Sequence, residues 1–390
     1  MEGKKIYFDN ASTTKPSNEV IREMMQSYVT AFGNPSSLHS FGRESIALID
    51  KARAQIANAI GAKPNEIYFT SGGTEANNWA IRGLAYANKN KGNHIITSKI
   101  EHPSILEECK KLEKEGFVVT YLDVDDKGVV KLEDLLHHIN SKTILISIMS
   151  ANNEVGTIQH IQAIAKTANE KDIKFHTDAV QAVGNIAFNV EAMGIDAMSI
   201  SSHKINGPKG VGALYVKNGV KIDGLIVGGK QERGLRGGTQ NVPAIIGFGK
   251  AIELSAKEMT SKNKKVRALS EYLIKKLSDN FEDIKFNGHM AQRIPGIVNI
   301  SFDYIKSESI ITILDLNGIA VSAGSACSAG SLEISHVLKA MGLDDILAQG
   351  AIRISLSASN TKEEIDYFIE KLIPIVSKLR NLSPLRKRKK

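Results

Sequence analysis

The sequence predicts an α/β fold with a mainly parallel sheet and a second, smaller α+β domain. Short apolar runs alternate with segments of helical periodicity, so consecutive strands should be joined by helical crossovers. Such connections give a parallel sheet that helices cover on both faces. The length of 390 residues exceeds one small domain, and 42% hydrophobic with 24% charged residues is the balance of an ordinary globular protein.

The apolar runs and periodic segments identify the elements of the larger domain. The expected strands are Glu66–Thr70, His94–Ser98, Val118–Leu122, Ile144–Met149, Lys174–Thr177, Ala197–Ile200 and Ala213–Val216. The expected helices between them include Glu75–Asn88, Ser104–Glu115 and Ile161–Glu170. In this type of sheet, ligands bind at the carboxyl ends of the strands.

The pattern changes after about residue 240. A long helical stretch at Val242–Leu277 is followed by irregular strands and a closing helix at Lys362–Leu379. We therefore predict a large domain at residues 15–255 and a small α+β domain made of residues 1–14 and 256–390. The N-terminal segment should pack on the small domain.

Composition excludes several classes of protein. The two cysteines, Cys109 and Cys327, are far apart and form no CxxC pair, which argues against a disulfide framework or a metal site and favours the reducing cytoplasm. No apolar run approaches the ~18–20 residues of a membrane span. Residues Met1 to Tyr7 contain no apolar signal region. Part of the net charge of +8 lies in the final residues, Arg386 to Lys390.

Three strand ends carry polar residues that suit a cofactor. Gly73 and Thr74 follow the first strand and open a helix, which makes either a phosphate site or only a tight connection. Asp178 follows another strand and is either a helix N-cap or a partner for a cofactor ring nitrogen. Lys204, after a third strand, is either a surface lysine or one that forms an imine.

This constellation resembles the fold-type I enzymes that use pyridoxal 5′-phosphate. Further segments are similar to the NifS/IscS-type cysteine desulfurases of the class V aminotransferase family, in order from about residue 6 to 384. These segments are Tyr7–Thr14, Asn34–His39, Glu101–Ser104, Asn152–Gly156, Ser201–Lys204, Arg233–Thr239 and Ser325–Cys327.

The resemblance implies roles in binding pyridoxal phosphate. Lys204 would bind the cofactor covalently, and Asp178 would keep its ring nitrogen protonated. Gln181 and Asn153 would lie near its 3′ oxygen, and His102 would stack on the ring, although a helix-start histidine is the plainer interpretation. The remaining expected contacts are to the phosphate, from Gly73, Thr74, Ser201 and His203, with Thr239 reaching it from the other subunit of a homodimer.

Other residues would serve the substrate. By resemblance, Arg353 binds the carboxylate of L-cysteine, helped by Asn34 and Asn153. Cys327 would be the nucleophile, and its small neighbours predict a loosely packed segment that lets the thiol move. Cys109 shares an apolar helical face with Ile105, Leu106 and Leu112 and is expected in the core.

The implied activity is conversion of L-cysteine to L-alanine with a persulfide formed on Cys327. His102 would donate or accept a proton in the sulfur step. The sulfur would pass to an acceptor such as an iron–sulfur scaffold protein, or into tRNA thiolation. The alternatives are a selenocysteine lyase or another enzyme of this fold. The basic tail at 386–390 is interpreted as a solvated terminus, and direct nucleic-acid or membrane binding is not expected.

Overall fold

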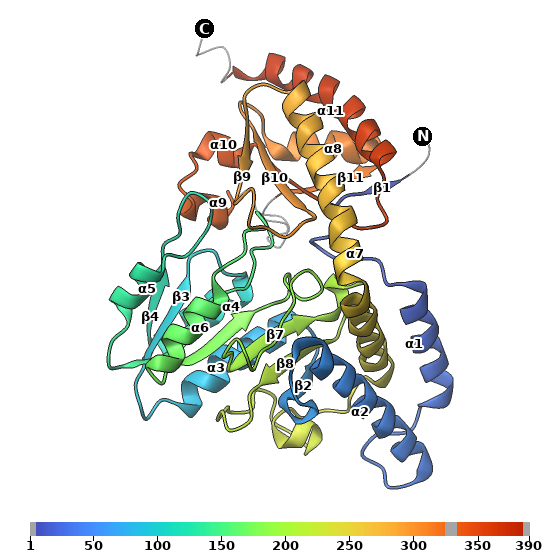
Figure 1. Ribbon diagram of the computed structural model, residues 1–390, viewed down its shortest axis with the longest axis vertical. Coiled ribbons are helices and arrows are strands. Elements are labelled where there is room, and N and C mark those ends of the chain that lie inside the picture. The colour runs from blue at the N-terminus through green and yellow to red at the C-terminus, as the bar shows by residue number, and fades with distance from the viewer. Residues whose placement is uncertain (1–4, 324–333, 385–390) are drawn as a thin grey trace.

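The computed structural model describes residues 5–323 and 334–384. Cys327, its small neighbours and the basic tail lie outside these ranges. Figure 1 shows two parts of the molecule, a larger one built on a sheet and a smaller one above it, with one long helix running through both.

A seven-stranded sheet forms the centre of the larger part. Its strands are β2 (Ile67–Thr70), β3 (His94–Ser98), β4 (Val118–Leu122), β5 (Thr143–Ser147), β6 (Lys174–Asp178), β7 (Ala197–Ser201) and β8 (Gly212–Val216). The strand order is β2-β8-β7-β6-β5-β3-β4. Strand β8 is antiparallel to both neighbours and the other adjacent pairs are parallel. The mainly parallel sheet and its seven predicted strands are thus confirmed.

Helices cover both faces of this sheet, as predicted. They are α1 (Asn18–Thr30), α2 (Ser40–Ile60), α3 (Gly73–Ala87), α4 (Pro103–Lys114), α5 (Leu132–His138), α6 (Ile161–Glu170) and α7 (Val242–Asn280). Alternate residues of a strand point to opposite faces. On β3, Ile95 therefore packs in the cluster of α3 and α4, whereas Ile96 packs in the cluster of α2, α6 and the start of α7.

The smaller part contains an antiparallel sheet and the helices that pack against it. Its sheet has the order β12 (Ser322–Ala323), β13 (Ala351–Ser355), β10 (Ile297–Phe302) and β9 (Ile284–Asn287). Its helices are α8 (Ser307–Leu316), α9 (His336–Ala340), α10 (Asp345–Gln349) and α11 (Lys362–Leu382). The N-terminal strand β1 (Ile6–Tyr7) pairs with β11 (Ile319–Ala320), so the N-terminal segment packs here as expected.

Helix α7 belongs to both parts. Its residues from Val242 to Ile252 pack in the core of the larger part, and those from Val266 to Leu277 pack in the core of the smaller part. Between Ile252 and Val266, helix α7 passes from the core of the larger part to the core of the smaller part. The predicted domain boundary near residue 255 lies within that interval. Within the described ranges, no helix is long and apolar enough to cross a membrane.

Cys109 lies on α4 with its side chain buried among Ile105 and Leu112, which confirms its predicted place in the core. Burial also raises the pKa of its thiol, so the group is not nucleophilic. Cys109→Ser should lower the free energy of unfolding by about 1–3 kcal/mol, because it buries a hydroxyl in apolar surroundings. Urea unfolding of both variants tests this, because Cys109→Ala should lower the free energy of unfolding by less than Cys109→Ser. A serine variant as stable as the wild type would contradict it.

Candidate active site

The carboxyl ends of the central strands border a cavity of about 670 Å³. Its walls come from the strand ends of β6 and β7, the starts of α3 and α4, the loop after β5, the N-terminal segment, and β13 of the smaller part. Most of the predicted site residues meet here: Gly73, Thr74, His102, Asn153, Asp178, Gln181, Ser201, His203, Lys204 and Arg353.

The start of α3 is shaped for an anionic group. A Cβ atom at Gly73 would lie 2.8 Å from Val180 Cγ2, so glycine leaves the helix N-terminus open to a ligand. Next to Gly73, Ser201 Oγ is buried and has no hydrogen-bond partner among the described residues. A buried hydroxyl without a partner is unfavourable unless a ligand supplies one. These observations fit the phosphate of the expected cofactor.

Asp178 is the last residue of β6, and both of its carboxylate oxygens are held. Asn77 Nδ2 donates to Oδ2 at 2.7 Å, and the backbone N–H of Val180 donates to Oδ1 at 2.9 Å. The Val180 contact closes a turn, and no helix begins in the described residues between β6 and β7, so the N-cap interpretation of Asp178 is wrong. The fixed carboxylate remains available for the cofactor role. Asn77 was not predicted, although a buried asparagine one turn after Thr74, on an otherwise apolar helix face, is a usable signal.

His102 is the N-cap of α4, and its Nδ1 accepts from the backbone N–H of Ser104 at 3.1 Å. A nitrogen that accepts from an N–H carries no proton, so the proton of the ring is on Nε2. Ser104 Oγ lies 2.8 Å from the same Nδ1 and accepts from Asn77 Nδ2 at 2.9 Å. A chain of hydrogen bonds therefore links His102 to Asp178 through Ser104 and Asn77.

The charge state of His102 follows from its surroundings. Burial lowers the pKa of the imidazole; Asp178 opposes this, while Lys204 and His336 lower it further. Burial likewise lowers the pKa of His203 to about 4, with Lys204 and Lys209 adding to the effect. Both rings are neutral at physiological pH and are available as hydrogen-bonding groups.

Lys204 closes the short 3-10 turn η2 (Ser202–Lys204) that follows β7. Its Nζ donates to the carbonyl oxygens of Ala11 at 2.5 Å and Ser12 at 2.8 Å. Gln181 Nε2 donates to the same Ala11 oxygen at 2.7 Å. The N-terminal segment thus orients the amine and the amide that the sequence assigned to the cofactor.

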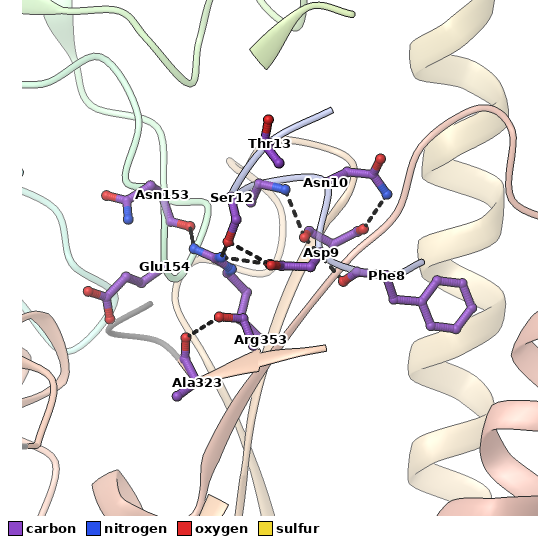
Figure 2. Close-up of polar contacts among 12 residues, drawn as sticks. Phe8, Asp9, Asn10, Ser12, Thr13, Asn153, Glu154, Ala323 and Arg353 are labelled. Carbon is purple, nitrogen blue, oxygen red and sulfur yellow. Dashed lines mark hydrogen bonds and ion pairs between the residues drawn. The ribbon is translucent and has the colours of Figure 1, made fainter. Parts of the chain in front are cut away.

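Arg353 projects from β13 to the edge of the cavity with only 1% of its surface exposed. Figure 2 shows its guanidinium between two segments: Nη1 donates to Asn153 O at 2.9 Å, and Nη2 donates to Asp9 Oδ1 at 2.9 Å and Ser12 Oγ at 2.5 Å. Its Nε is buried without a hydrogen-bond partner in the described part of the chain. Asp9 and Ser12 were not predicted as site residues, although both lie in the quoted Tyr7–Thr14 motif.

Three predicted residues do not line this cavity. Asn34 lies in the loop between α1 and α2, where its Oδ1 accepts from the N–H of Ser36, and Thr239 lies exposed after the turn η3 (Gln231–Gly234). Cys327 falls outside the described residues. The roles of all three stay predictions.

Comparisons with known proteins agree on one family. A family model described as "Aminotransferase class-V" matches residues 6–368. "Cysteine desulfurase IscS" of Clostridium botulinum is 51% identical over 98% of this chain and 97% of its own length. The protein of the same name from Methanosarcina thermophila is 50% identical over 98% and 95%. A solved structure titled "NIFS-LIKE PROTEIN" has a TM-score of 0.91 at 41% identity, covering 96% of this chain and 100% of that one.

A buried carboxyl group lies directly behind the site. Glu101 precedes His102, and its Oε1 accepts from Ser98 Oγ at 2.6 Å and from Met149 N at 3.0 Å. Its Oε2 has no partner among residues 5–323 and 334–384. Burial raises the pKa of Glu101 to about 8 despite these hydrogen bonds, and the Asp178 charge adds to the rise.

This carboxyl group should make stability depend on pH. The folded chain keeps a proton on Glu101 that the unfolded chain releases, so the free energy of unfolding falls as pH rises from about 5 to about 8. The slope due to one such group is at most about 1.4 kcal/mol per pH unit. Glu101→Gln should remove this contribution, so denaturant unfolding at several pH values should give a flatter dependence. Equal slopes in variant and wild type would contradict the assignment.

Proposed function

The chain belongs to the class V aminotransferase family, and we propose that it is a pyridoxal-phosphate-dependent cysteine desulfurase acting on L-cysteine. The observation that carries this proposal is the convergence of Asp178, Lys204 and Arg353 on one cavity that also holds the open start of α3. Asp178 suits the ring nitrogen of the cofactor, Lys204 its carbonyl carbon, and Arg353 the carboxylate of the substrate. The start of α3 suits the cofactor phosphate. The relatives named cysteine desulfurase favour cysteine over the alternative substrate, selenocysteine.

Residues from three strand ends would hold the cofactor. Gly73, Thr74, Ser201 and His203 would bind its phosphate, Asp178 would face the ring nitrogen, and Lys204 would bind it covalently. When bound, pyridoxal phosphate supplies an electron sink for the bonds at the substrate α-carbon. Asp178 supports this function because a fixed buried carboxylate stabilises a protonated ring nitrogen. His102, on the same hydrogen-bond chain, would pack against the ring.

Arg353 and Lys204 would act on the substrate itself. The guanidinium of Arg353 would bind the cysteine carboxylate, and its contacts to Asp9 and Ser12 fix the orientation in which it does so. The Nζ of Lys204 would remove the α-proton and return it. Neutral His102, with its proton on Nε2, suits proton transfer at the substrate sulfur.

Cys327 would complete the reaction. Its thiolate attacks the sulfur of the substrate, a sulfur–sulfur bond forms as the carbon–sulfur bond breaks, and the carbon takes a proton and leaves as L-alanine. The thiol is thereby oxidised to a persulfide and the substrate carbon is reduced, so no further redox partner is needed. An acceptor protein, such as an iron–sulfur scaffold, or a tRNA thiolation enzyme would then take the sulfur. The reducing cytoplasm suits this thiol.

We also propose that the active form is a homodimer. Exposed apolar side chains gather at the end of α1, where Tyr28 is 65%, Val29 is 75% and Phe32 is 68% exposed in the single chain. A group of this kind is typical of an interface. The exposure of Thr239, away from its own cavity, suits a contact to a second copy.

Two substitutions test the proposed chemistry. Lys204→Ala should abolish alanine formation from L-cysteine. The variant lacks both the amine that binds the cofactor covalently and the base that removes the α-proton of the substrate. Cys327→Ser should keep the visible absorbance of the bound cofactor but yield no persulfide by mass spectrometry. Cys109→Ser is the matched control and should form persulfide normally. Alanine production by the Lys204→Ala enzyme, or a persulfide on Cys109, would overturn the proposal.

A further inference from the structure

A buried ion pair fastens the segment before Thr239 to helix α2, and a backbone hydrogen bond fastens it to strand β2. Glu232 Oε2 accepts from Arg53 Nη1 at 2.8 Å, and Glu232 Oε1 accepts from Arg53 Nη2 at 3.0 Å. The backbone N–H of Phe69 on β2 also donates to Oε2, at 2.9 Å. Both side chains are buried, with 8% of Arg53 and 1% of Glu232 exposed. The two-pronged geometry fixes Glu232 in one orientation.

The backbone at this point adopts an unfavourable conformation. Glu232 has φ 43° and Arg233 has φ 58°, which are left-handed values that residues other than glycine rarely adopt. Besides the ion pair, Arg233 Nη2 donates to the carbonyl of Ile67 at 2.7 Å, and its guanidinium lies 3.8 Å from the centre of the Tyr68 ring. Such strain persists where surrounding contacts hold it, and it is often found at functional sites.

A second ion pair fastens the same segment to the phosphate site of its own chain. Arg236 Nε and Nη2 donate to the two carboxylate oxygens of Glu75 at 2.9 and 3.1 Å. Glu75 lies in the first turn of α3, directly after Gly73 and Thr74, and also accepts from the N–H of Ser71 at 2.8 Å. The chain beyond Arg236 therefore leaves a rigid base, and Thr239 is exposed at its end.

We propose that Arg53 and Glu232 are positioning residues that act across the subunit interface. Their ion pair holds Thr239 where it contacts the cofactor phosphate of a second copy of the chain. Burying two charges is costly unless they are well paired. We infer that this cost is offset by the rigid support that the pair gives to the segment before Thr239. The inference rests on the proposed cofactor and homodimer, and it predicts that a defect in this pair appears in the partner's active site.

Mixed dimers test this directly. Dimers of a Glu232→Gln chain and a Lys204→Ala chain, purified through different tags, have their working lysine in the Glu232→Gln chain. That site receives Thr239 from a chain with an intact ion pair, so it should release cofactor at the wild-type rate. When both changes are in one chain and the other is wild type, the working site receives the altered segment. Cofactor release from that working site should be on the order of tenfold faster than in the wild type, as expected for loss of a charged hydrogen bond.

Controls separate the possible failures. Glu66→Gln alters another buried carboxylate beside β2, which accepts from the backbone N–H groups of Lys63 and Asn218, and should leave cofactor release unchanged. Arg53→Lys, which keeps the charge and loses the fork, replaces Glu232→Gln if that variant does not fold. Equal release in both mixed dimers, or a defect only where the altered chain carries the lysine, would overturn the inference. A wild-type enzyme that retains cofactor but forms no alanine would overturn the proposed activity instead.

Discussion

The buried carboxylate of Asp178 is the charge around which the site is arranged. A carboxylate in this position is unfavourable unless hydrogen bonds and a positive charge compensate it. Asn77 and the N–H of Val180 supply the hydrogen bonds, and the protonated ring nitrogen of the cofactor would supply the charge. Since β6 lies between the parallel strands β5 and β7, Lys204 and Ser201, at or just after the end of β7, necessarily lie near it.

The N-terminal segment contacts residues on both sides of the cavity, Lys204 near Asp178 and Arg353 on β13. Its carbonyl oxygens at Ala11 and Ser12 receive the Lys204 amine, and its Asp9 carboxylate pairs with Arg353 of β13. Figure 2 shows the contacts of Arg353 with Asp9 and Ser12 of the segment. The segment also pairs with β11 through β1, so the smaller part of the molecule is positioned against the strand ends of the larger part that line the cavity.

Sequence patterns predicted what is local. Strand ends followed by Gly73, Asp178 or Lys204 were identified because the residue type and its position along the chain carry the information. Arg353 was assigned by resemblance alone, and the structure places it at the cavity. The antiparallel direction of β8 was not specified, although residues 202–211 are too few for a parallel crossover, which needs about a dozen or more.

What the patterns missed depends on contacts between distant residues. Asp9 meets Arg353 across 344 positions, and Arg53 meets Glu232 across 179, so neither pair has a local signature. Asn77 links His102 and Asp178 from a third element. Side-chain pairing of this kind becomes visible only once the sheet has brought the segments together.

The most direct test is the protonation state that Asp178 imposes on the cofactor. The ¹⁵N chemical shift of ring-labelled pyridoxal phosphate, bound to the wild-type protein at neutral pH, should be that of a protonated pyridine nitrogen. Asp178→Asn should shift it to the unprotonated value while the cofactor stays bound. An unprotonated nitrogen in the wild type, or no difference between the two proteins, would contradict the account.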